Sequence, residues 1–226
     1  MHRHLTWDGC HNVRDLGGLG RIRPGALVRA DALERLTARG WAALQAHGVR
    51  TIVDLRNPDE IGDDDAPRPA SLTTIRIPLD GMEDTEFWDQ WIHRPEFGTP
   101  HYYAPWLERF PDRATAALTA IARAEPGGVA YHCGIGRDRT GLVTMLLLAA
   151  LDVPAGEAAE DYALSVDRVP ALLARLGAAE QVDELAGVYR RQATTPAEVF
   201  ARVMASVDPA LYLPAEDRAA LRARAL

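Results

Sequence analysis

Lysine is absent from this chain of 226 residues, so its 25 basic residues are all arginine. The absence excludes mechanisms that need a lysine, such as Schiff-base chemistry or the lysine of a Walker-type nucleotide loop. Cysteine is scarce as well, because only Cys10 and Cys133 occur. Two cysteines are too few for a disulfide framework and are typical of a protein from a reducing cytoplasm.

Long hydrophobic runs and excess positive charge are also missing. The apolar stretch 143–151 is too short to span a bilayer, and the first ten residues lack the apolar core of a signal peptide. A net charge of -7 argues against nucleic acid as a partner, since nucleic-acid binding depends on basic surface. We therefore expect a cytoplasmic protein without a membrane span.

Apolar strand patterns alternate with helical patterns in the first two thirds of the chain. Strands are expected at 26–29, 50–55, 72–78 and 129–132, with helices at 38–46, 105–124 (broken at Pro111) and 140–151. This alternation predicts an α/β fold with a mostly parallel sheet flanked by helices. After Pro154 only helices are expected, at 155–166, 170–176, 181–192, 196–206 and 214–225. The prediction is a single domain over 1–226, with an α/β core of about 1–153 and a helical cap over 154–226.

The most informative segment is 132–141, which reads His-Cys-Gly-Ile-Gly-Arg-Asp-Arg-Thr-Gly. Glycine-containing turns let successive backbone N–H groups converge on an anion, and the start of a following helix adds more of them. Cys133 would lie at the floor of this cup, where the helix N-terminus and nearby cations favour the thiolate. Arg139 could grip two phosphoryl oxygens with its planar guanidinium. The segment therefore predicts a phosphate-binding loop that carries a nucleophile.

This segment resembles the signature of the cysteine-dependent protein tyrosine phosphatase superfamily, His-Cys-x-x-Gly-x-Asp-Arg-Thr-Gly. The stretches 11–18, 23–25 and 27–30 resemble the opening of a bacterial tyrosine phosphatase-like group related to lipid phosphatases. That group usually has Phe at the position of Val13 and Arg-Ser at 29–30. Segments 53–60 and 160–165 follow in the expected order, so the resemblance covers most of the chain and is weakest in the cap.

The resemblance implies a protein tyrosine phosphatase-like fold and a two-step hydrolysis of phosphate monoesters. Cys133 would attack phosphorus, and water would then hydrolyse the cysteinyl-phosphate. The residues expected around the phosphate are Gly134, Ile135, Gly136, Arg137, Asp138 and Arg139. No cofactor or metal is expected. The substrate would be a phosphoprotein, through tyrosine or dual specificity; a phosphoinositide or a small phosphorylated metabolite is the alternative, and a non-catalytic phosphate-binding module is the third hypothesis.

The leaving oxygen needs a proton, so a carboxylic acid must stand above the cup. Asp138 lies inside the signature, as in the lipid-directed relatives, and the resemblance favours it. Asp80 follows the strand at 72–78, roughly where many superfamily members carry a movable acid loop. Asp54, Asp84 and a water molecule are weaker candidates.

Several neighbouring residues have two interpretations each. His132 is expected to hold the loop backbone from behind, and Thr140 to donate to the thiolate or cap the helix. Arg137 either binds a second anionic group of the substrate or is a solvated charge at the rim. The aromatic stretch 87–106 either packs in the core or forms an apolar wall over the cup. Cys10 either is a small structural residue or forms a reversible disulfide with the nucleophile.

Overall fold

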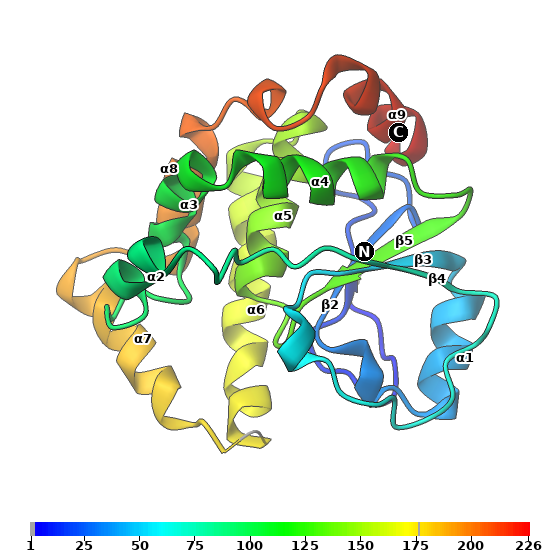
Figure 1. Ribbon diagram of the computed structural model, residues 1–226, viewed down its shortest axis with the longest axis horizontal. Helices are drawn as coiled ribbons and strands as arrows, with labels where there is room; N and C mark the ends of the chain where they lie inside the picture. The colour runs from blue at the N-terminus through cyan, green and yellow to red at the C-terminus, as the bar shows by residue number, and fades with distance from the viewer. Residues whose placement is uncertain (1–2, 176) are drawn as a thin grey trace.

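The computed structural model describes residues 3–175 and 177–226, and their strands form one sheet in the order β1-β2-β5-β3-β4 (Figure 1). The strands are β1 Arg14–Asp15, β2 Leu27–Ala30, β3 Val49–Asp54, β4 Thr73–Arg76 and β5 Gly128–His132. Only β1 pairs antiparallel, with β2, whereas the other three pairings are parallel. The predicted mostly parallel sheet is therefore confirmed, and β1 is an addition that was too short to predict.

Helices connect and follow these strands. The α-helices are α1 Ala38–Ala46, α2 Thr85–Trp91, α3 Tyr103–Arg109, α4 Pro111–Ala122, α5 Asp138–Ala150, α6 Ala155–Arg175, α7 Glu180–Arg191, α8 Pro196–Ser206 and α9 Ala215–Ala225. The 3-10 helices are η1 Leu33–Arg35, η2 Pro58–Glu60, η3 Pro100–Tyr102 and η4 Pro209–Leu211. None of the helices in the described parts of the chain is long and apolar enough to cross a membrane.

Local signals in the sequence explain where several helices begin and end. Thr37 caps α1 by accepting a hydrogen bond from the backbone N–H of Gly40, and Gly48 follows the helix with a positive φ of 94°. The break expected at Pro111 is present, since α3 ends at Arg109 and α4 begins at Pro111.

One helix prediction was wrong. The segments 155–166 and 170–176 were predicted as separate helices, but α6 runs without interruption through Pro170. A proline inside a helix removes one hydrogen bond, and the buried side chains of Val169 and Leu172 on either side show that packing holds the helix together. Leu176, at the end of the second predicted helix, lies outside the described residues.

The central strands β2, β3 and β5 are largely buried on both faces, whereas the edge strand β4 is partly exposed. One face packs against α4 and α5, and the other packs against α1 (Figure 1). On β5, Val129 and Tyr131 belong to the first core and Ala130 belongs to the second. The loop that follows β5 begins at the carboxyl ends of the parallel strands, where such sheets bind ligands.

Candidate active site

Cys133 lies immediately after β5, and its side chain is only 1% exposed. Its sulfur accepts a hydrogen bond from Thr140 Oγ1 at 3.2 Å, from the first turn of α5. Behind it, His132 Nδ1 lies 3.2 Å from the backbone oxygen of Cys133. Burial lowers the pKa of His132, so the ring is neutral at pH 7. This is the geometry that the predicted supporting roles of His132 and Thr140 need.

The carbonyl groups of the loop are held outward by two residues from the N-terminal part of the chain, Asn12 before β1 and Arg29 in β2. Asn12 Nδ2 donates to the carbonyl oxygens of Ile135 at 3.0 Å and Gly136 at 3.1 Å. Arg29 Nη2 also donates to the Gly136 oxygen, at 2.8 Å. Both donor side chains are completely buried, so the loop is anchored from inside the protein.

Because these carbonyl groups point outward, the N–H groups of the same peptide units point inward. In a trans peptide the C=O of one residue and the N–H of the next point in opposite directions. The N–H groups of Gly136 and Arg137 therefore point away from Asn12 and toward the cup, the space enclosed by residues 133–139. Gly136 has a φ of 69°, and a Cβ there would lie 2.6 Å from the Ala30 oxygen, so only glycine fits this turn.

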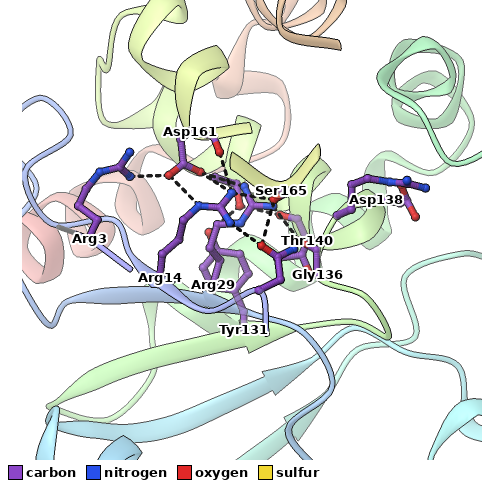
Figure 2. Close-up of polar contacts among 12 residues, drawn as sticks. Arg3, Arg14, Arg29, Tyr131, Gly136, Asp138, Thr140, Asp161 and Ser165 are labelled. Carbon is purple, nitrogen blue, oxygen red and sulfur yellow. Dashed lines mark hydrogen bonds and ion pairs between the residues drawn. The ribbon is translucent and has the colours of Figure 1, made fainter. Parts of the chain in front are cut away.

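A buried cluster of charges, which we call the Asp161 cluster, supports these anchors (Figure 2). It consists of Arg3, Arg14, Arg29, Asp161 and Ser165. Asp161 Oδ2 accepts from Arg14 Nη2 at 3.0 Å and from Arg29 Nη1 at 3.1 Å. Burial alone would raise the pKa of Asp161, but the two guanidinium groups hold it well below its usual range. The cluster thus ties α6 to β1, to β2 and, through Arg29, to the loop.

Arg139 is held by two carboxylates, and one edge of its guanidinium group remains available for a ligand. Its Nη1 and Nη2 each donate to Glu60, and Nη1 lies 2.9 Å from Asp80 Oδ2. Burial would lower the pKa of Arg139, but Glu60 and Asp80 raise it above its ordinary value. A guanidinium has five N–H donors. The two that no described residue occupies, on Nε and Nη2, lie along one edge and can grip two phosphoryl oxygens.

Asp80 lies beside Arg139 and is fixed on both its backbone and its side chain. Its carbonyl oxygen accepts from Trp88 Nε1 at 3.1 Å and Trp106 Nε1 at 3.3 Å, and its Oδ2 accepts from Asn57 Nδ2 at 2.9 Å. Burial raises the pKa of Asp80 to about 6, although Arg139 opposes the rise. The two tryptophans are buried core residues, so this part of the aromatic stretch packs in the core and also positions a carboxyl group.

Asp138 is paired with Arg137 at the start of α5. Arg137 Nε donates to Asp138 Oδ1 at 2.8 Å, and the Asp138 side chain points away from the Asp161 cluster (Figure 2). Arg137 is 9% exposed, so the interpretation as a solvated rim charge was wrong. Burial raises the pKa of Tyr102, and the charges of Asp138 and Asp80 raise it further, so both predicted acids lie within electrostatic reach of this tyrosine.

The other predicted candidates are engaged elsewhere. Asp54 accepts from Arg56 Nε at 2.9 Å, and Asp84 caps α2. Both cysteines are free thiols, and Cys10 Sγ donates to the Ala32 oxygen at 3.4 Å. Within the described residues, no group of three or more His, Cys, Asp or Glu is arranged to hold a metal.

Sequence reasoning missed the residues that hold the loop and its arginine: Asn12, Arg29, Asn57, Glu60 and Asp161. They stood inside stretches that carried the family resemblance, but no role was assigned to them. A signal was present for one of them, because a charged residue in the apolar strand Leu-Val-Arg-Ala of β2 needs a buried partner.

Comparisons with known proteins match the chain to phosphatases. Residues 5–215 match a family model described as the tyrosine phosphatase family. A putative tyrosine-protein phosphatase of Cupriavidus necator is 32% identical over 178 residues, which cover 74% of this chain and 64% of that protein. A tyrosine-protein phosphatase of Nostoc commune is 34% identical over 146 residues, which cover 64% of this chain and 49% of the relative. The triple specificity protein phosphatase PtpB of Mycobacterium tuberculosis is 28% identical over 198 residues, which cover 74% of this chain and 71% of that protein. The match thus spans about half to two thirds of the first two relatives' own length.

Proposed function

The chain belongs to the tyrosine phosphatase family, and from this premise we propose that it hydrolyses phosphate monoesters of phosphoproteins, phosphotyrosine first, through a cysteinyl-phosphate. The observation that carries the proposal is the free edge of Arg139 beside a buried thiol, in a loop whose carbonyls are turned outward. A phosphate dianion needs such converging donors, and a nucleophile beneath it is placed for in-line attack.

In the first step the sulfur of Cys133 forms a bond to phosphorus while the bond from phosphorus to the ester oxygen breaks. The Thr140 hydroxyl donates a hydrogen bond to the sulfur at 3.2 Å and holds it in place before attack. The equatorial oxygens accept hydrogen bonds from Arg139 Nε and Nη2 and from the inward N–H groups, which stabilise the charge that these oxygens carry in the transition state. In the second step water attacks phosphorus and gives a proton to the carboxylate that protonated the leaving oxygen, the sulfur leaves as thiolate and inorganic phosphate is released.

We assign the proton that the leaving oxygen receives to Asp80. Its pKa of about 6 keeps a useful fraction protonated near neutral pH, and its carboxyl group lies against Arg139 at the cup. The resemblance favours Asp138, but one oxygen of that carboxylate already accepts from Arg137. In this assignment Asp138 positions Arg137 and does not transfer the proton.

The nucleophile is tested by trapping. After rapid quenching with an aryl phosphate, the intact mass of the wild-type protein should increase by one phosphoryl group, and Cys133→Ser should show neither the adduct nor turnover. Cys10→Ser is the matched control and should retain both. Turnover by Cys133→Ser, or a protein that binds phosphate without forming the adduct, would refute the proposed reaction.

The acid is tested with two esters that differ in leaving group. Asp80→Asn should lower kcat for phenyl phosphate by about 10²–10⁴-fold and for 4-nitrophenyl phosphate far less, because the better leaving group needs no proton. Asp138→Asn should affect both esters equally. The opposite pattern would transfer the role to Asp138. A screen of phosphopeptides, phosphoinositides and phosphorylated metabolites, ranked by kcat/KM, tests the substrate class.

A further inference from the structure

A cavity of about 300 Å³ lies between α6 and α7. These two helices lie on the side of the molecule away from α1 (Figure 1). Its size is at the lower end of the range for small-molecule sites. Its walls include Val166, Val169 and Leu173 from α6 and Val182, Leu185 and Ala186 from α7. We call it the α6–α7 pocket.

The chemistry of the walls favours an uncharged apolar occupant. The aliphatic side chains of both helices face the space, and Val182, Leu185 and Ala186 are only partly buried although they are apolar. Two charged residues line the pocket: Arg137 at the inner end is already neutralised by Asp138 at 2.8 Å, and Arg190 is exposed to solvent. A second anion would compete with that carboxylate, whereas an alkyl or aryl group would remove apolar surface from water at no such cost.

The pocket adjoins the phosphate-binding loop at its inner end. Arg137 lines the pocket and is also a residue of the phosphate-binding loop. Gly98, another lining residue, lies against both Arg137 and Asp138: a Cβ there would be 3.1 Å from Arg137 Nη2 and 3.7 Å from Asp138 Oδ1. The pocket therefore lies beside the phosphate-binding loop, next to Arg137 and Asp138.

We propose that the α6–α7 pocket binds the apolar part of the substrate's own alcohol, so that the enzyme selects phosphate esters whose leaving group carries an alkyl or aryl extension. This inference rests on the proposed function and names the leaving-group class of that site. The walls bind the extension, and the cup binds the phosphoryl group.

The test compares kcat/KM for 4-butylphenyl phosphate with kcat/KM for phenyl phosphate. The wild-type protein should prefer the butyl ester by at least tenfold, which is the ratio expected from burying about two methylene groups. Ala186→Trp, which fills the pocket from α7, should abolish the preference and leave turnover of phenyl phosphate within about threefold. Ala171→Trp is the matched control, because Ala171 is exposed on α6, and it should keep the preference. If Ala186→Trp does not fold, Val182→Phe fills the same space.

Each failure has a distinct signature. Equal kcat/KM for the two esters in the wild-type protein, or a preference that survives in Ala186→Trp, overturns the pocket and leaves the proposed function standing. Butylbenzene that inhibits phenyl phosphate turnover without competing with it would show a separate effector site and also overturn the proposal. A lack of turnover with either ester refutes the proposed function, and this inference falls with it.

Discussion

Replacing Asp161 by Asn should destabilise the protein more than any comparable change of a surface carboxylate. The carboxylate is completely buried between Arg14 and Arg29, which are also completely buried. Even with Asp161 present, burial and the neighbouring Arg29 lower the pKa of Arg14 to about 10. The substitution would keep the size of the side chain but would leave two adjacent guanidinium groups without a buried counter-charge.

The magnitude follows from the burial of all three groups. Breaking a buried ion pair by removing one partner costs about 3–5 kcal/mol, because a charge remains buried without compensation. For a domain of this size 1 kcal/mol shifts Tm by about 2–4 °C, so Asp161→Asn should lower Tm by about 6–20 °C. Asp64→Asn is the matched control: Asp64 and Arg68 form a partly exposed pair outside the helices, and exposed pairs contribute about 0.2–1 kcal/mol.

The assay is urea unfolding at several pH values, followed by tryptophan fluorescence. The folded-state pKa of Asp161 is depressed below its unfolded value of about 3.9, so its stabilising contribution is full above that pH and is lost as pH falls toward the folded-state value. The difference between wild type and Asp161→Asn should therefore be largest near pH 7 and shrink below about pH 4. A difference at pH 7 no larger than that of Asp64→Asn, or one that grows in acid, would refute this account of the cluster.

Three further predictions concern catalysis. Arg139→Lys should lower kcat/KM for phenyl phosphate by about 10²–10³-fold, because an ammonium group cannot grip two oxygens at once; steady-state kinetics that show less than a tenfold loss would contradict this. Glu60→Gln should lower kcat/KM for phenyl phosphate by about tenfold, because only one of the two side-chain oxygens that accept from Arg139 remains at position 60. Unchanged kinetics would exclude a positioning role for Glu60. In a pH profile, kcat/KM should fall as pH rises above about 6, because Asp80 then loses the proton that it donates. The fall in kcat should occur at higher pH, because the bound phosphate dianion raises the pKa of Asp80 further. Asp80→Asn should abolish this fall, and a fall that persists in the variant would show that another group causes it.

The sequence was sufficient wherever the determining interactions are local. The loop could be predicted because the thiol, the glycines and Arg139 are contiguous and their chemistry fits one ligand. The bounds of α1 were predicted correctly because Thr37 caps the helix and Gly48 follows it with a positive φ. The break at Pro111 followed from the missing N–H of proline.

Prediction failed where a distant part of the chain decides the outcome. The continuity of α6 through Pro170 depends on tertiary packing that outweighs the local cost of proline. The burial of Arg137 depends on α6 and α7, whose arrangement no local pattern specifies. Asn12 donates to two loop carbonyls that are 123 and 124 positions away in the chain. A single sequence shows Asn12 as a polar residue in an N-terminal motif and cannot show which backbone groups it holds.

The charges around the cup indicate what attracts a phosphate dianion. Arg137 is neutralised by Asp138, and Arg139 faces both Glu60 and Asp80, so the side chains at the rim supply little net positive charge. The attraction must come mainly from the inward N–H groups of the loop and from the N-terminus of α5, both of which act only if the loop keeps its shape. That shape depends on Asn12 and Arg29, which bind the loop carbonyls, and on Asp161, which pairs with Arg29 inside the protein. The contiguous signature therefore supplies the donors of the phosphate site, and the buried N-terminal and α6 residues determine where those donors point.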